Sequence, residues 1–366
     1  MENLPHKSLF SGMLYFGEEM DKNMSNRADW VDYGKGIGII LVVYGHLLSS
    51  GFHAGLNIPE RFYILSDSIV YSFHMPFFFF LSGLFVEGSL QKRGPKSYLF
   101  DKFSRIAYPY LIWSVLQVST EVIFSSQTQK GASLADLLAI PYKPWGQFWF
   151  IYALLLMHIV YTVFTYCFGK YSTLLMFIIA SILYLNPSHS SLMGLFGFSM
   201  HFLFFVSGIV FRRYFINMEK YNAPLWAVVI LFIVFMGSAY FIFGNLVEPV
   251  RMASGAQTHP FYFLYLAVLG ITFCICLSQY LSKKNGFQFL QILGIYSLQI
   301  YLVHMLAGVG TRMVLLHVFG IQNWVIHIII GVGLALTSAI VLQKTSDWFK
   351  FPYLFEFKRN YGPISS

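Results

Sequence analysis

A lysine and a histidine lie eleven residues apart in the stretch from Arg27 to His46, RADWVDYGKGIGIILVVYGH. In a helix, Lys35 and His46 are separated by about 16 Å, at a rise of about 1.5 Å per residue. Ionisable side chains inside a membrane-spanning segment are costly and by default indicate a functional site. A histidine with its ordinary pKa of about 6.5 accepts a proton at neutral pH when a carboxylate or carbonyl fixes its tautomer. His46 is therefore a candidate general base, and Asp67 is the candidate carboxylate that orients it.

Counting residues inward from the outer end of each apolar run places the ionisable side chains in three layers. His46 and Asp67 share the outer layer with Glu121 and Arg312. The middle layer, near the bilayer centre, contains His74, His201 and His304. The inner face carries Lys35, Lys92, Arg93, Lys96, Lys102 and Arg105. The candidate catalytic residues are His46, Asp67, His74 and His304. A histidine in a helix bundle can also bond across helices in a purely structural role.

The apolar runs that carry these residues predict a polytopic membrane protein. Of the 366 residues, 57% are hydrophobic and 11% are charged, against about a quarter charged in soluble domains. Because only helices satisfy so much backbone in lipid without a closed barrel, we expect an all-α bundle of about ten transmembrane helices. The expected spans are 36–52, 63–86, 106–125, 148–167, 172–187, 192–211, 225–244, 262–281, 290–317 and 323–343. They imply a cytoplasmic segment at 1–35, a transmembrane domain at 36–343 and a short cytoplasmic tail at 344–366.

The formal net charge of +8 is explained by membrane topology rather than by nucleic-acid binding. With the amino terminus inside, the inner segments contain 19 of the 24 lysines and arginines and the outer loops contain four. Such a bias predicts that both termini are cytoplasmic. The three cysteines, Cys167, Cys274 and Cys276, lack the spacing of a metal site or a disulfide framework. We therefore expect no bound metal.

Two similar segments, FFFFLSGLF at 77–85 and FLFFVSGIVF at 202–211, each follow a histidine and end at a basic loop. Their Ser-Gly pairs, Ser82-Gly83 and Ser207-Gly208, are small enough to let two helices approach closely. We favour this packing role over a nucleophilic serine. Pro76 and Pro109 would interrupt helical hydrogen bonding locally, which membrane helices tolerate where a cavity or a neighbour compensates.

The opening block DWVDYGKGIGIILVVYGH resembles the signature of the acyltransferase 3 family of integral membrane acyltransferases. Four later blocks agree with the family in order: FHMPFFFFLSGLF from Phe73, DKFSRIAYPYLIWS from Asp101, WGQFWFIYALL from Trp145 and LGIYSLQIYLVH from Leu293. The resemblance covers most of the chain. The opening block is most similar to members that O-acetylate bacterial sugars, such as the fucose acetylase group.

The resemblance implies an O-acetyltransferase in the bacterial cytoplasmic (inner) membrane. Acetyl-CoA would bind at the cytoplasmic face, where Lys35, Lys102 and Arg105 offer charge to its phosphates. The family most often has arginine at the position of Lys35, which argues for a point-charge contact there rather than a bidentate one. The acceptor, a polysaccharide or its lipid-linked precursor, would lose a hydroxyl proton to His46. Tyr44, Trp149 and Tyr301 are candidate donors to the oxyanion.

Two other function classes fit part of the pattern. A transporter or glycan exporter also has about ten spans, a central ionisable layer and internal similarity. A non-catalytic membrane scaffold would leave the basic inner face and the histidine layer unexplained. Direct acyl transfer and transfer through an acylated residue both remain open, as does the identity of the short acyl group.

Overall fold

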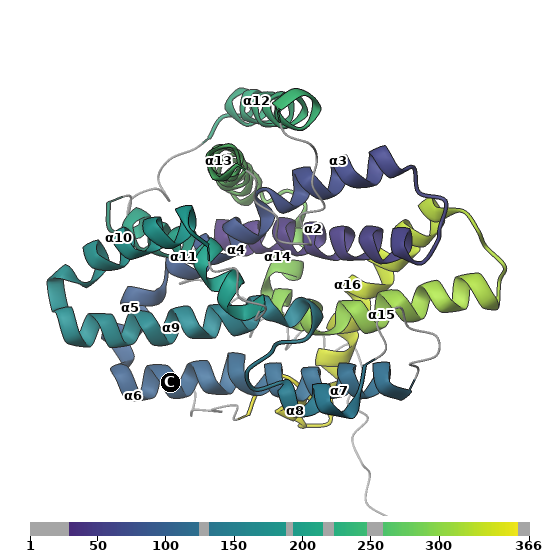
Figure 1. Cartoon of the computed structure of the whole chain (residues 1–366), viewed down its shortest axis with the longest axis horizontal. Helices are drawn as coiled ribbons and strands as arrows, with labels where there is room; N and C mark the ends of the chain where they lie inside the picture. Colours follow the sequence, from purple (N-terminus) through teal and green to yellow (C-terminus); the bar gives the residue numbers. More distant parts are fainter. Residues whose placement is uncertain (1–28, 124–131, 188–192, 215–222, 247–258, 358–366) are drawn as a thin grey trace, which may run out of the picture.

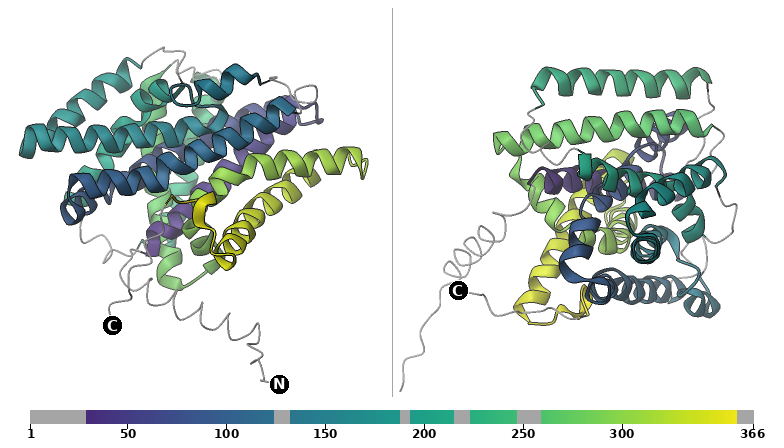
Figure 2. Two further views of the ribbon diagram at one scale, coloured as in Figure 1. Left: turned by 90° about the horizontal axis from the view of Figure 1, so that it is seen from below. Right: turned by 90° about the vertical axis from the view of Figure 1, so that its left-hand side faces the viewer.

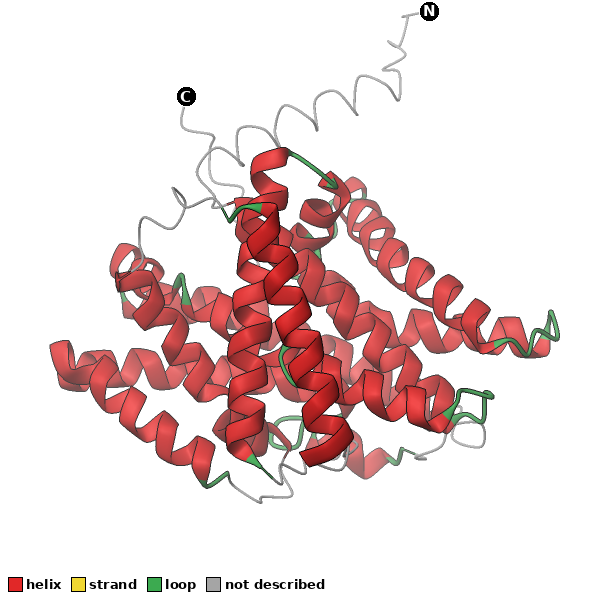
Figure 3. Ribbon diagram, turned by 90° about the horizontal axis from the view of Figure 1, so that it is seen from above, coloured by secondary structure: helices red, strands yellow, loops and turns green. Residues whose placement is uncertain are grey.

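The computed structural model describes residues 29–123, 132–187, 193–214, 223–246 and 259–357, and within them the chain is helical without any strand (Figures 1 and 3). The first helices are α2 (Asp29–His53), α3 (Glu60–Tyr71), α4 (His74–Gly83), α5 (Val86–Arg93), α6 (Pro95–Lys102), α7 (Tyr108–Ile123) and α8 (Leu134–Ala139). They are followed by α9 (Trp149–Phe168), α10 (Ser172–Leu185), α11 (Met193–Tyr214), α12 (Leu225–Phe241), α13 (Pro260–Lys284), α14 (Gln288–Ile295), α15 (Ser297–His317) and α16 (Trp324–Trp348). The expected all-α membrane architecture is confirmed.

Eight stretches of the described residues are long and apolar enough to cross a membrane, against about ten spans expected. Two differences account for the count. The stretch Gly146–Leu185 contains two expected spans, α9 and α10, which join through a turn at Gly169. The expected span at 106–125 forms α7, which has only 16 residues, whereas a straight crossing needs about 20.

The expected span at 63–86 is not one continuous helix. It divides into α3 and α4 around Ser72 and Phe73, and α4 begins at His74. Pro76 lies in the first turn of α4, where a backbone N–H has no intrahelical partner and proline is tolerated. His74 therefore starts a new helix instead of lying in the middle of a long one.

Helices α4 and α11 pack against each other (Figure 1). They meet at the glycines of the two Ser-Gly pairs, so the predicted close approach is confirmed. A Cβ on Gly83 would collide with the carbonyl oxygen of Phe205, and a Cβ on Gly208 would collide with that of Phe80. The two glycines also face each other across the crossing. Backbone atoms cannot move aside as side chains can, so this crossing requires glycine on both helices.

Helix α2 lies at the centre of the bundle and packs against α3, α4, α13, α14, α15 and α16. Its contact with α14 is equally close, because a Cβ on Gly36 would meet the backbone of Leu290 and one on Gly294 would meet that of Asp32. Helix α12 packs against α13 at the edge of the bundle (Figure 2). Exposed apolar side chains cover it, among them Leu225, Trp226, Ile230 and Ile233. A helix with this surface suits contact with lipid.

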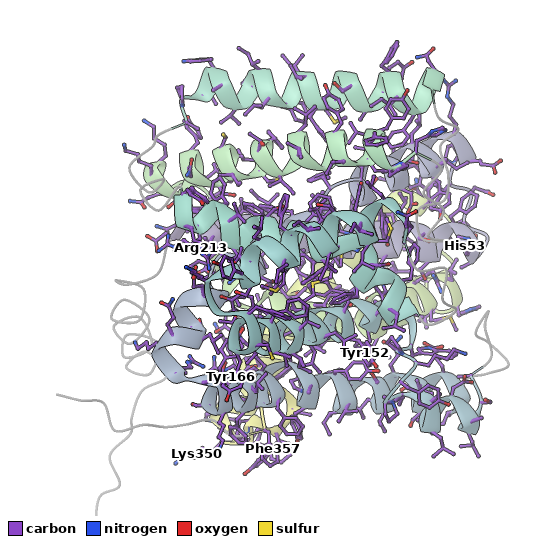
Figure 4. All side chains as sticks on the ribbon, turned by 60° about the vertical axis from the view of Figure 1, so that its left-hand side comes forward. His53, Tyr152, Tyr166, Arg213, Lys350 and Phe357 are labelled. Atoms are coloured by element: carbon purple, nitrogen blue, oxygen red, sulfur yellow. The ribbon has the colours of Figure 1, made fainter. Side chains whose placement is uncertain are left out.

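The two ends of the bundle differ in charge. Arg213 and Lys350 lie toward one end, and His53, the last residue of α2, lies at the opposite end (Figure 4). We call the first the basic end. Arg213 there pairs with Glu87 on α5, and the cations Arg93, Lys102 and Arg105 follow Glu87 closely in the chain. Lys35 lies near the basic end of α2, and His46 lies eleven residues further toward the other end.

Candidate active site

Three predicted histidines from distant parts of the sequence meet inside the bundle. The ring of His46 on α2 lies 5.2 Å from the ring of His304 on α15, measured between centroids. Tyr71, the last residue of α3, connects the third: its ring is 6.2 Å from His46 and 4.6 Å from His74. We call His46, Tyr71, His74 and His304 the histidine cluster. Tyr71 was missed by the sequence analysis, although it precedes His74 by only three residues.

Hydrogen bonds to backbone carbonyls determine the tautomer of two members of the cluster. The Nδ1 of His74 lies 2.7 Å from the carbonyl oxygen of Val70, and the Nδ1 of His304 lies 2.7 Å from that of Tyr301. A carbonyl only accepts, so in both rings Nδ1 carries the proton and Nε2 presents a lone pair. The Nε2 of His304 is buried and has no hydrogen-bond partner among the described residues.

His46 differs from these two histidines. It is half-buried, whereas His74 and His304 are buried. Its contacts in the described part of the chain are ring contacts with Tyr71 and His304, without a hydrogen bond to a carbonyl. Neither ring nitrogen is therefore occupied by a backbone group. Within the cluster, His46 is the imidazole best placed to bond an incoming hydroxyl.

The expected pair of Asp67 with His46 is not formed. Asp67 is buried on α3, one helical turn before Tyr71. Because α3 ends at Tyr71, the Tyr71 ring lies beside His46, and Asp67 lies about 6 Å further along α3. Asp67 and Tyr71 lie four residues apart and so share one face of α3, and it is the tyrosine ring that contacts His46.

A network of amides links α7 to Tyr301, three residues before His304 on α15. The hydroxyl of Tyr301 donates to the backbone carbonyl of Gln147. The side chains of Gln147 and Gln117 exchange two hydrogen bonds, of 2.6 and 3.2 Å. The carboxylate of Glu121 accepts from Gln117 at 3.1 Å and from the indole of Trp145 at 3.0 Å. Tyr301 therefore positions the loop before α9, and its hydroxyl is already used, contrary to a role as oxyanion donor.

This network could have been found from the sequence of α7. Gln117 and Glu121 are four positions apart, so they share one helix face. A second missed pair is buried nearer the basic end, where the hydroxyl of Tyr98 lies 2.6 Å from the Nδ1 of His158. His201, by contrast, packs its ring against Phe79 and Trp149 and has no ring contact with the histidine cluster.

At the basic end, three cations surround one carboxylate. Asp101 lies 2.5 Å from Arg93, 3.1 Å from Arg105 and 3.8 Å from Lys102, measured between the ion-pairing atoms. The Nε of Arg105 also pairs with Glu356 at 3.2 Å. Arg105 is thus held by two carboxylates, and Lys102 makes the longest of these contacts. Arg93 was expected on this inner face but was not among the residues expected to bind the donor.

Lys102 and Lys35 each have part of the side chain open to an incoming anion. The side chain of Lys102 is 21% exposed, and that of Lys35 is 27% exposed and lies 3.5 Å from Asp32. Burial lowers the pKa of Lys102, with Asp101 opposing and Arg93, Arg105 and Lys35 adding to the effect. A phosphate beside Lys102 would relieve this repulsion. The residues present therefore fit the phosphates of a coenzyme A thioester.

The histidine cluster and the basic end are joined by one continuous helix. Lys35 and His46 both lie on α2, so the predicted separation of about 16 Å applies to the folded protein. No group of three or more His, Cys, Asp or Glu side chains within the described ranges is arranged to hold a metal ion. The arrangement can hold an anion at one end and accept a proton from a hydroxyl in the interior.

Comparison with known proteins agrees with this arrangement. The family model described as "Acyltransferase domain" matches residues 28–344. The chain is also 27% identical, over 222 residues or 60% of its length, to "Nodulation protein NolL" of Mesorhizobium japonicum. A protein of the same name from Sinorhizobium fredii is 27% identical over 234 residues, or 61% of this chain. These alignments span 56% and 61% of the two relatives. No solved structure matches.

Proposed function

Because this chain belongs to the acyltransferase 3 family and is a multi-pass membrane acyltransferase, we propose that it transfers acetyl from acetyl-CoA to a carbohydrate hydroxyl. The acceptor is a cell-surface or exported polysaccharide, or its lipid-linked precursor. The observation that carries the proposal is the contact between His46 and His304, whose ring centroids lie 5.2 Å apart in the interior. His46 lies on the helix that also carries Lys35. A bacterial inner membrane with the basic end in the cytoplasm is part of the proposal.

The donor binds at the basic end through its phosphates. Lys102 and Lys35 contribute charge, and Arg105 contributes the N–H groups that its ion pairs with Asp101 and Glu356 do not use. The thioester then extends along α2 toward His46, a distance of about 16 Å. This path keeps the charged part of the donor in water and brings only its neutral end into the membrane interior, which avoids burying phosphate.

The acceptor enters from the end of the bundle where α2 finishes. Its hydroxyl oxygen attacks the thioester carbonyl while its proton moves to His46, and a new C–O bond forms. The C–S bond then breaks, and the proton returns to the sulfur, which leaves as the free thiol of coenzyme A. The imidazolium of protonated His46 donates a hydrogen bond to the Nε2 of His304, which has no other partner among the described residues. His74 and Tyr71 line the same space.

Asp67 retains a proposed role at a distance from His46. It lies one turn from Tyr71 on α3, so its charge acts on the cluster through the field around Tyr71 rather than through a hydrogen bond to His46. Asp67→Asn removes this charge with little change in shape. We expect it to alter the pH dependence of transfer more than the affinity for acetyl-CoA.

The test of the proposed function is donor dependence. Purified protein in nanodiscs is incubated with labelled acetyl-CoA and an envelope glycan extract, and the label in the glycan is counted. Glycans from a deletion strain and its parent identify the acetyl group that disappears. Absence of both acetyl-CoA binding and labelled glycan, together with movement of sugar or ions in proteoliposomes, would instead establish the transporter or exporter.

Lys102→Gln is expected to raise the KM for acetyl-CoA about 10–100-fold, because it removes one charge-assisted contact worth about 1.5–3 kcal/mol. In the unchanged protein this KM should rise with pH through the lowered pKa of Lys102, since a neutral amine no longer attracts phosphate. Lys102→Arg should postpone that rise to higher pH. The measurement is the KM for acetyl-CoA from about pH 7 to about pH 10.

Lys96→Gln is the matched control for Lys102→Gln. Lys96 lies on the same helix, α6, and is exposed. The Lys96→Gln variant also removes one positive charge, but it leaves the three cations around Asp101 in place. An equal rise in KM for both variants would show that only the general field of the basic end matters, and that Lys102 does not contact the donor.

A further inference from the structure

Arg312 on α15 is a cation within a membrane span, and no carboxylate accompanies it in the described residues. Its guanidinium Nη1 donates to the carbonyl oxygen of Ser50 at 2.7 Å and lies 2.5 Å from the Ser50 hydroxyl. An arginine inside a span usually pairs with an acid or lines a polar cavity. The bonds to Ser50 orient the guanidinium without neutralising its charge.

Most of the hydrogen-bonding capacity of Arg312 remains available. A guanidinium has five N–H groups, and its hydrogen bonds to the described residues use Nη1 alone. Arg312 is half-buried, and its nitrogens are not among the fully buried atoms that lack a hydrogen-bond partner. The remaining N–H groups therefore reach a surface from which a ligand can approach. Their planar fork matches the paired oxygens of a phosphate or a carboxylate.

The position of Arg312 relates it to the histidine cluster. Ser50 follows His46 on α2 by one helical turn, about 6 Å. Arg312 follows His304 on α15 by eight residues, about 12 Å. Both helices run in the same direction here, because His46 contacts His304 and Ser50 contacts Arg312. The guanidinium thus lies on the side of the cluster opposite to Lys35, where the acceptor enters in the proposed function.

We propose that Arg312 binds an oxyanion of the acceptor, a phosphate or a carboxylate, and so selects an acidic acceptor. This inference rests on the proposed function, because it takes the end of α2 as the acceptor side. An anionic group held by Arg312 places the neighbouring sugar one to two helical turns inward, at His46. The donor and the acceptor are then each held by cations, at opposite ends of the same pair of helices.

A binding experiment tests the inference without any transfer reaction. Glucose, glucose 1-phosphate and glucuronate are titrated into the protein in phosphatidylcholine nanodiscs, with saturating coenzyme A to occupy the basic end. We expect at least one of the two anions to bind more tightly than glucose, and Arg312→Gln to weaken that anion about tenfold or more. Glucose 1-phosphate against glucuronate distinguishes phosphate from carboxylate. Arg312→Lys should retain part of the preference as a point charge.

Arg61→Gln is the matched control, because Arg61 is exposed at the start of α3, at the same end of the bundle. It should leave the preference for anions in place. Equal binding of glucose and both anions to the unchanged protein overturns the inference, as does an equal loss in Arg312→Gln and Arg61→Gln. A preference that disappears on adding phosphatidylglycerol to the nanodiscs assigns Arg312 to a lipid phosphate, which also overturns it.

The proposed function can fail separately from this inference. If no labelled acetyl reaches any glycan while the anion preference depends on Arg312, anion binding at Arg312 is supported and the proposed transfer reaction is overturned. If transfer occurs and the ratio of kcat/KM for glucose 1-phosphate to that for glucose is the same in Arg312→Gln, the enzyme stands and the acidic acceptor does not.

Discussion

His46→Ala is expected to reduce acetyl transfer by about 10²–10⁴-fold, the contribution of a positioned general base. The acceptor hydroxyl would then lose its proton to nothing better than water, because His74 and His304 are buried whereas the half-buried His46 is open to an incoming hydroxyl. Labelled acetyl counted in the glycan measures the loss. His46→Gln should be equally inactive, since an amide can bond the hydroxyl and cannot take its proton.

The control for His46→Ala is His53→Ala on the same helix. His53 lies at the end of α2, where its Nδ1 bonds the carbonyl of Ser49 at 2.8 Å (Figure 4). That variant should retain most of the transfer activity. Binding of coenzyme A should be unchanged in both variants, because Lys35 lies about 16 Å from His46 along α2. Full activity of His46→Ala would remove His46 from the reaction.

Gly83→Ala is expected to lower the free energy of unfolding by about 1–3 kcal/mol, and Gly83→Leu to prevent assembly of the bundle. The added Cβ would collide with the carbonyl oxygen of Phe205, so α4 and α11 would have to separate. Because α4 begins with His74, the separation would also disturb the histidine cluster. Thermal unfolding in detergent measures the stability, and labelled acetyl transfer measures the activity.

Gly237→Ala is the matched control, since Gly237 lies in α12 and a Cβ there meets no atom within 4 Å. Alanine is a better helix former than glycine by about 1 kcal/mol in soluble helices, so this variant should lose no stability. Gly208→Ala should be as harmful as Gly83→Ala, because a Cβ on Gly208 meets the carbonyl oxygen of Phe80. Unaltered unfolding of Gly83→Ala would show that the two helices can separate without cost.

The architecture was largely predictable from the sequence because it depends on local composition. Long apolar runs predict helices wherever lipid excludes unpaired backbone groups. Each of the expected apolar spans falls on one or two of the helices from α2 to α16. Spacing within one helix was equally reliable: Lys35 and His46 lie on α2 as expected. The Ser-Gly pairs were interpreted correctly because only small residues permit two backbones to touch.

The predictions that differed from the structure depend on where helices end. The expected span at 63–86 places Asp67 and His74 on one continuous helix. The break at Ser72 and Phe73 turns α4 relative to α3, and Tyr71 at the end of α3 takes the position beside His46. Apolar composition is the same on both sides of such a break, so the hydropathy of the run does not reveal it.

The sequence alone thus determined the membrane class, the family resemblance and the placement of charge along each helix. Only the tertiary structure decided that His46 contacts His304 and Tyr71, and that Arg312 bonds Ser50 with no carboxylate beside it among the described residues. The physical reason is that the charge and the hydropathy of each position are set by its residue type and can be read directly from the sequence. A catalytic contact depends instead on the direction in which each side chain leaves its helix and on the crossing of helices far apart in sequence.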